Sequence, residues 1–183
     1  MSWRHAAVCA ALVAAMAIAL AAMGHPAICT CGYVKAWHGV PLSSENSQHV
    51  TDWYTFSHVI HGFGFYALTW VAMRNRALGV RLAAAVLLEC AWEVFENTDY
   101  VINRYREVTI SLDYYGDSVL NSVADVAAMI LGFWVAARAP IALTLALFLA
   151  FEAFVGYMIR DNLLLNMLML VYPLEAVRRW QAG

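Results

Sequence analysis

The sequence is short of charge. Only 13% of its 183 residues are Asp, Glu, Lys or Arg, whereas 63% are apolar; soluble domains carry about 25% charged residues. The 11 basic and 13 acidic residues nearly cancel, so the chain lacks the basic excess of a nucleic-acid-binding protein. Four cysteines are too few for a disulfide-built scaffold. Four prolines and ten glycines without a biased tract argue against disorder. These absences leave an integral membrane protein surrounded by membrane lipids.

Apolar segments of near-membrane length recur along the whole chain. A transmembrane helix needs about 20 apolar residues, so the chain has room for about six. We therefore expect an all-α, polytopic membrane helical bundle that forms one membrane domain over residues 1–183. The first segment exceeds the apolar part of a secretory signal, about 7–15 residues, which favours an uncleaved helix over a cleaved signal. The expected spans are 6–24, 56–73, 82–97, 117–137, 141–159 and 162–177, with outer loops at 25–55 and 98–116.

Basic residues indicate the sidedness, because the cytoplasmic loops of membrane proteins are enriched in Lys and Arg. With the N-terminus inside, seven arginines fall on the cytoplasmic side and four basic residues outside, although the outer loops are much longer. We therefore expect both termini in the cytoplasm. The inner residues are Arg4, Arg74, Arg76, Arg81, Arg138, Arg178 and Arg179, and the outer ones are Lys35, Arg104, Arg106 and Arg160.

Ionisable residues inside the expected spans share faces of their helices. Spacings of three, four and seven residues place side chains on one helical face. An acidic residue facing lipid at the bilayer centre would cost about 2.5–3.5 kcal/mol, so we expect these faces to meet around an outward-opening acidic pocket. They carry His58 and His61 in the second span, Glu89, Glu93 and Glu96 in the third, Asp117, Asn121 and Asp125 in the fourth, and Glu152 in the fifth.

The residue types in this pocket suggest acid–base or metal-assisted chemistry. A carboxyl group beside a histidine can serve as general acid or base. Two histidines on one helix face with carboxylates from other helices are ligands typical of metal centres in bundles. The expected catalytic residues are His58, His61, Glu89, Glu93, Glu96, Asp117, Asn121 and Asp125. Substrate binding is expected from Arg104, Arg106, Glu152, Arg160 and Asp161, and binding of a divalent metal from His58, His61, Glu93, Glu96 and Asp117.

Three functions fit the pocket. The first is a hydrolase or transferase that acts on a lipid-linked or cell-wall intermediate. The second is a non-catalytic factor, in which the polar network holds helices together, with Arg104 or Arg106 folded back on the acids, or binds such a molecule. The third is a proton or cation carrier, which the apolar stretches 126–135 and 141–149 disfavour because they leave no polar path to the inner surface.

Cys29 and Cys31 stand apart in the first outer loop. The alternatives for this pair are a small disulfide ring, two free thiols, or a metal site completed by His25 or His38. A structural or redox-inert role is favoured. Ser118 is expected to cap the fourth span rather than to act as a nucleophile, because no Gly-x-Ser-x-Gly motif surrounds it.

Several strings resemble a known family. The chain is similar to a domain-of-unknown-function family of bacterial multi-pass inner-membrane proteins. The resemblance implies a location in the bacterial cell inner membrane and a multi-pass topology, and no established activity. The strings that carry it are Ser44-Glu-Asn-Ser-Gln-His49, Asp52-Trp-Tyr54, His58-Val-Ile-His-Gly62, Trp92-Glu-Val-Phe-Glu-Asn97, Ile110-Ser-Leu-Asp-Tyr-Tyr-Gly-Asp-Ser-Val-Leu-Asn121 and Gly156-Tyr-Met-Ile-Arg-Asp-Asn162.

A more distant resemblance is to VanZ-like membrane proteins, which are associated with glycopeptide-antibiotic resistance. In those proteins an acidic helix end is followed by an arginine and then by an Asp-x-x-x-Asn helix rich in small residues. Ala124 stands here where that pattern has glycine. The matching residues, in order, are Glu96, Arg106, Asp117, Asn121 and Gly132.

Overall fold

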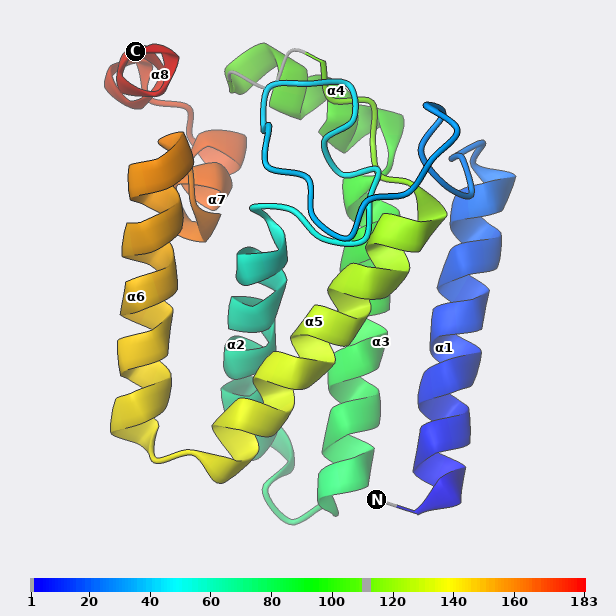
Figure 1. The fold of residues 1–183 in the computed structure, drawn as a ribbon. Helices are drawn as coiled ribbons and strands as arrows, with labels where there is room; N and C mark the ends of the chain where they lie inside the picture. Colours follow the sequence, from blue (N-terminus) through cyan, green and yellow to red (C-terminus); the bar gives the residue numbers. More distant parts are fainter. Residues whose placement is uncertain (1, 110–112) are drawn as a thin grey trace.

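The computed structural model describes residues 2–109 and 113–183 and folds them into a bundle of α-helices (Figure 1). This confirms the expected all-α helical bundle. Residues 110–112 of the expected outer loop 98–116 lie outside the described residues. The helices are α1 (Trp3–Ala22), α2 (Thr55–Met73), α3 (Leu78–Glu96), α4 (Asp99–Val108), α5 (Val119–Arg138), α6 (Ile141–Ile159), α7 (Leu163–Val171) and α8 (Glu175–Ala182).

Five long helices, α1, α2, α3, α5 and α6, run between the lower end of the bundle, where the N-terminus lies, and the upper end, where the long loops gather (Figure 1). Within the described ranges, three of them, α1, α5 and α6, are long and apolar enough to cross a membrane by length and composition. A helix of 19 residues rises about 28 Å, close to the thickness of a bilayer core. These three helices support membrane association.

The last expected span, 162–177, is not a single long helix. The chain reverses at Arg160, whose φ of 55° ends α6, and α7 has only nine residues. Helix α7 is short because the side chain of Asn162 caps its start and Pro173 follows its end. Nine residues rise about 14 Å, which is too little to cross a bilayer. The C-terminus lies at the upper end, opposite the N-terminus (Figure 1). This fold therefore does not confirm the expected sixth span or the expected placement of both termini in the cytoplasm.

The expected outer loop 98–116 contains a helix. Thr98 caps α4 by accepting a hydrogen bond from the backbone N–H of Val101. The hydropathy pattern did not predict this helix, because α4 mixes apolar with charged side chains. It lies across the upper end of the bundle (Figure 1). Its buried face turns toward α3 and α7.

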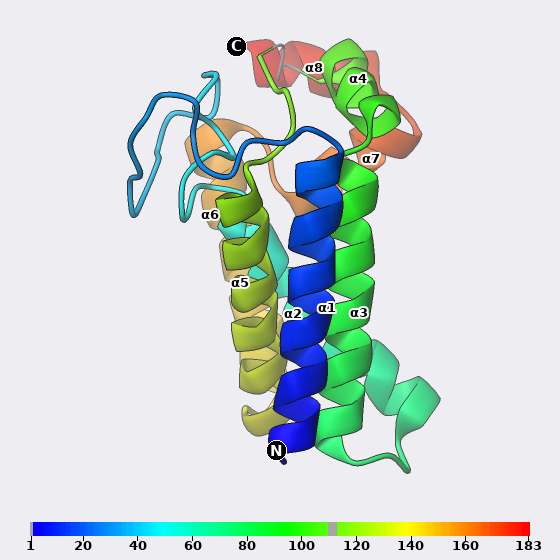
Figure 2. The same ribbon diagram turned by 90° about the vertical axis from the view of Figure 1, so that its right-hand side faces the viewer.

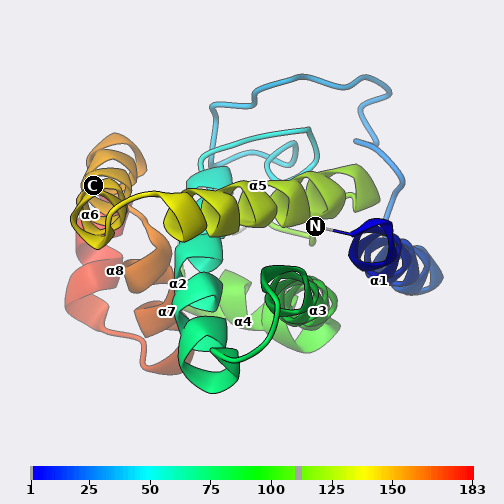
Figure 3. The same ribbon diagram turned by 90° about the horizontal axis from the view of Figure 1, so that it is seen from below.

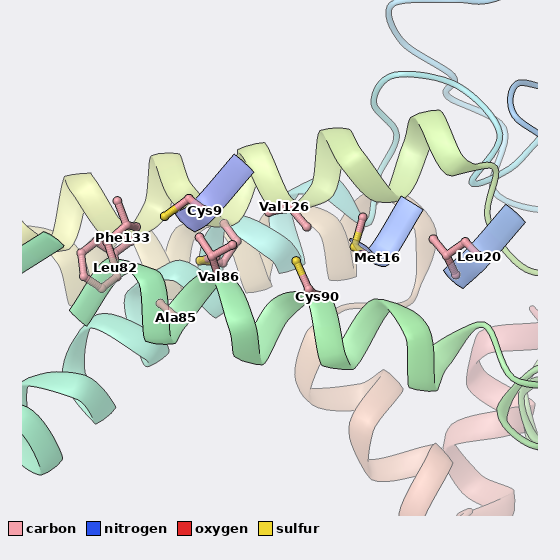
Figure 4. Close-up of a cluster of buried hydrophobic side chains, with 10 residues drawn as sticks. Cys9, Met16, Leu20, Leu82, Ala85, Val86, Cys90, Val126 and Phe133 are labelled. Carbon is pink, nitrogen blue, oxygen red and sulfur yellow. The ribbon is translucent and has the colours of Figure 1, made fainter. Parts of the chain in front are cut away.

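Apolar contacts hold α1, α3 and α5 together, from Phe133 near the lower end of the bundle to Leu20 near the upper end of α1. Figure 2 shows α1 lying beside α3. Between these helices the side chains of a buried apolar cluster interdigitate (Figure 4). Close packing of such side chains stabilises helix contacts in a membrane, where lipid is as apolar as the side chains themselves. The cluster consists of Cys9, Met16, Leu20, Leu82, Ala85, Val86, Cys90, Val126, Met129 and Phe133.

Glycines let α2 and α5 cross in close contact (Figure 3). A Cβ atom at Gly62 would overlap the backbone of Met129, and one at Gly132 would overlap the backbone of Val59. Small residues at such crossings allow helix backbones to approach each other. The crossing brings the histidine-bearing upper turns of α2 against the polar face of α5.

Candidate functional site

Side chains from α2, α3 and α5 meet around His58. Its Nδ1 atom lies 2.7 Å from Glu89 Oε1 and 3.4 Å from Glu93 Oε1. Its Nε2 atom lies 3.8 Å from Asp125 Oδ2. His61, one turn further along α2, places its Nδ1 atom 3.1 Å from Glu89 Oε2. The four-residue spacing of the two glutamates therefore directs both carboxylates at the same imidazole ring.

This cluster is almost fully shielded from solvent. Glu89 and Glu93 are 0% exposed, and His58 and Asp125 are buried as well. Glu89 is well paired, because each of its carboxylate oxygens faces a histidine nitrogen. In contrast, both carboxylate oxygens of Glu93 are buried without a hydrogen-bond partner among the described residues. A buried carboxylate without such partners is costly, which makes Glu93 the least satisfied group of the cluster.

A cavity of about 50 Å³ lies against this cluster, large enough for water molecules or an ion. His58, His61 and Asp125 form part of its wall, and Glu96 and Asp117 line it as well. Among the described residues that line it, none is Lys or Arg. Five of the eight expected catalytic residues therefore line the cavity. Glu89, Glu93 and Asn121 do not line it.

The upper acids of the cavity are bound by neutral polar groups. Asn97 donates from Nδ2 to Asp117 Oδ2 at 2.9 Å, and the Tyr114 hydroxyl donates to Asp117 Oδ1 at 3.1 Å. The Tyr105 hydroxyl lies 3.0 Å from Glu96 Oε1. Burial raises the pKa of Tyr105 and Tyr114 well above that of a free tyrosine, so both hydroxyls stay protonated. Glu96 and Asp117 therefore belong to a layer separate from the cluster around His58.

A buried stretch of the first outer loop, residues 46–49 and 52, covers this layer, although the loop was expected only as a connection outside the membrane. Asn121 donates from Nδ2 to the carbonyl oxygen of His49 at 2.9 Å. Ser118 donates to the carbonyl oxygen of Gln48 and, as expected, caps α5. Asp52 accepts from the backbone N–H of Tyr54, and burial raises the pKa of Asp52 to about 6. A polar run in a loop is normally solvated, so only the fold distinguishes this one.

The residues expected to bind substrate lie away from the cavity wall. Glu152 accepts hydrogen bonds from the backbone N–H groups of Leu163 and Leu164, each at 3.1 Å, and so holds the start of α7. Asp161 accepts from the Tyr54 hydroxyl at 3.1 Å, and burial raises the pKa of Asp161 to about 6.

The three arginines expected to bind substrate make other contacts. Arg104 donates to the carbonyl oxygen of Leu170 at 3.1 Å. The Arg106 guanidinium lies 5.0 Å from the centre of the Tyr115 ring. Arg160 donates to the carbonyl oxygen of Trp180 at 3.2 Å. These contacts tie the upper helices together, and no ion pair between an arginine and the pocket acids is present in the described part of the chain.

Cys29 and Cys31 form a disulfide. This is the first of the three alternatives, and the side chains next to the disulfide are Glu45 and His49 rather than the His25 or His38 of the metal-site alternative. His25 instead bonds to the carbonyl oxygens of Asn97 and Asp117. Glu45 accepts from Lys35 Nζ at 2.6 Å, and hydrogen bonds from Lys35, His49 and Tyr33 lower the pKa of Glu45 to about 2.

Comparison with known proteins places the chain among bacterial relatives. Residues 20–183 match the family model described as "Protein of unknown function (DUF2585)". A UPF0314 protein of Sinorhizobium fredii is 54% identical over 182 residues, which cover 100% of this chain and 92% of that protein. A UPF0314 protein of Paracoccus denitrificans is 60% identical over 161 residues, covering 88% and 83%. No solved structure matches. These findings confirm the resemblance to a family of unknown function and do not show the resemblance to VanZ-like proteins.

Proposed function

Because the chain belongs to the DUF2585 family of proteins of unknown function, we propose its function from its geometry: a membrane enzyme of the hydrolase or transferase type that acts on a lipid-linked or cell-wall intermediate of the bacterial envelope. The observation that supports this proposal is the position of His58. Its ring lies between carboxylates of α3 and α5 and lines the cavity at the same time.

The arrangement suits general acid–base catalysis. Glu89, 2.7 Å from His58 Nδ1, fixes the orientation of the ring, and the opposite nitrogen is the base. In the proposed reaction His58 takes a proton from a water molecule in the cavity, and the oxygen of that water forms a bond to the acyl or phosphoryl centre of the substrate. The bond to the leaving group breaks, and the same proton passes from His58 to the leaving oxygen. A transferase would use an acceptor hydroxyl in place of water.

Access for such a substrate requires α7 to move. The cavity of about 50 Å³ is too small for a lipid headgroup, and Leu163, Asn166 and Met167 of α7 form one of its walls. The hydrogen bond between Tyr105 and Asn166, 2.9 Å apart, and the buried side chain of Met169 are among the contacts that such a movement would break. The apolar side chains of this wall suit an amphiphile that enters from the membrane.

A non-catalytic binding factor is the second candidate. The observation that favours it is the layer around Asp117 and Asn121, whose side chains are engaged in holding Asn97 and the loop. A proton or cation carrier is less favoured, because it needs a polar path to the lower end of the bundle. The buried side chains of α5 toward that end, such as Phe133, are apolar (Figure 4).

Complementation in bacterial cells tests the proposal. Cells that lack the protein should accumulate a lipid-linked or cell-wall intermediate, measured by mass spectrometry of lipid and cell-wall extracts. His58→Gln should fail to reverse that accumulation, whereas Glu107→Gln, on the exposed face of α4, should reverse it fully. Membrane abundance of each variant controls for folding. Full complementation by His58→Gln at normal abundance would contradict catalysis and leave the binding factor.

A further inference from the structure

We infer that a divalent cation binds between His58, Glu93 and Asp125. This inference goes beyond the proposed reaction and excludes it while the ion is bound, because an ion on His58 Nε2 occupies the lone pair that would otherwise accept the proton. Ion binding is measured without any substrate. One ligand atom from each of these three residues lies within 4.8 Å of the others. They come from three different helices, α2, α3 and α5, so the site exists only in the folded bundle.

Glu93 provides the observation that points to a cation. It is 0% exposed, and its two carboxylate oxygens have no hydrogen-bond partner among the described residues. Its Oε1 atom nonetheless faces His58 Nδ1 at 3.4 Å, so the carboxylate points into the cluster. Buried carboxylates in proteins are paired, hydrogen-bonded or bound to metals.

The balance of charge also favours a cation. Glu89, Glu93 and Asp125 carry as many as three negative charges in a volume that two histidines share. The cavity lining offers no Lys or Arg among its described residues. With His58 neutral, a divalent cation would cancel the charges of Glu93 and Asp125. Cancellation matters most where the surroundings are apolar and the effective dielectric constant is low.

The donor set indicates the kind of ion. One imidazole and two carboxylates suit Zn²⁺, Mn²⁺ or Fe²⁺, since imidazole favours the borderline metals and carboxylates the hard ones. Three protein ligands leave coordination positions open toward the cavity, as in catalytic metal sites. Glu89 would orient His58 without binding the ion itself, because it accepts from one nitrogen of His58 while the other nitrogen faces Asp125.

Two other clusters are weaker sites. His58, His61 and Glu89 also lie close together, but each oxygen of Glu89 already has a histidine partner. Glu45 and His49 lie beside the disulfide of Cys29 and Cys31, and Glu45 is engaged with Lys35 and His49. Neither cluster contains a buried oxygen without a partner.

Metal loading of the full chain in detergent tests the inference. After treatment with EDTA, the protein is dialysed against Zn²⁺ or Mn²⁺ and its metal content is measured by mass spectrometry. We expect about one ion per chain and a rise in Tm, because a ligand that binds only the folded state stabilises it. Glu93→Gln and Asp125→Asn should lose the ion, and Glu89→Gln should weaken binding about 10–100-fold. Glu107→Gln is the matched control and should load as the wild type does.

Two results would overturn the inference. One is a wild-type chain that takes up neither ion and shows no rise in Tm. The other is Glu93→Gln that binds the ion as tightly as the wild type. If Glu93→Gln fails to fold, Asp125→Asn is compared with the wild type instead. Asp125→Asn must then show no rise in Tm when the metal is added. If the wild type binds the ion but His58→Gln still complements cells, the inference stands and the proposed reaction is wrong.

Discussion

The lower and upper parts of the bundle are built on different principles. Below the cluster around His58, buried side chains of α3 and α5 such as Leu82, Val86 and Phe133 are apolar and belong to one packed cluster (Figure 4). Above it, buried side chains such as Asp117, Asn121 and Asp52 hold Asn97 and the backbone of the first loop by directional hydrogen bonds. The lower part therefore provides stability, whereas the upper part holds its side chains in the fixed positions that a reactive site needs.

The largest expected effect is in the lower part. Phe133→Ala should lower the free energy of unfolding by about 3–5 kcal/mol, because Phe133 is fully buried and its removal leaves a cavity. The control is Leu131→Ala on the exposed side of α5, which should cost far less. Thermal unfolding in detergent measures both. Equal losses would mean that the lower part is not the main source of stability.

A smaller effect is expected from the hydrogen bonds of the upper part. Asn121→Ala leaves the buried carbonyl oxygen of His49 without its donor, which costs about 1–3 kcal/mol. The loop stretch 46–52 should then exchange its amide hydrogens faster, while α1 and α3 keep their protection. Asn103→Ala, on the exposed face of α4, should leave exchange unchanged. Faster exchange throughout the chain would remove the distinction between the two parts.

The smallest effect concerns the exposed edge of the first loop. The pKa of Glu45 is about 2 in the folded chain, compared with 4.5 for a free glutamate. Its hydrogen bonds with Lys35, His49 and Tyr33 therefore stabilise the loop above pH 4.5, and this contribution is lost as the pH falls toward 2. Limited proteolysis of the loop should increase over that range. Glu45→Gln should flatten the pH dependence, and an unchanged profile would contradict this role.

The sequence predicted the faces of the helices but not all of their partners. The spacing of Glu89 and Glu93 correctly placed them on one face, and the structure directs that face at His58. Asn121 shares the polar face of α5, yet its side chain holds a loop carbonyl oxygen. Helical periodicity says which residues share a face, whereas the identity of the opposing group depends on a chain segment far away in sequence.

The upper helices show a second limit of sequence reasoning. The apolar run after Asn162 has the composition of a membrane span, but α7 ends at Val171. Glu152 and Asn162 fix where α7 begins, so its length follows from capping rather than from hydropathy. Helix α4 was overlooked for the opposite reason, because its charged residues hide an apolar face that packs against the bundle.

Composition and helical spacing are enough to predict the apolar character of the chain, the approximate positions of its five long helices and the faces that carry its acids and histidines. These properties follow from composition and from the 3.6-residue period of the helix, both of which are local. The meeting of Glu93 with His58 and Asp125, and the position of the loop over the upper layer, follow from long-range packing. The crossing of α2 and α5 at Gly62 and Gly132 sets those distances, and a crossing depends on how distant segments pack together.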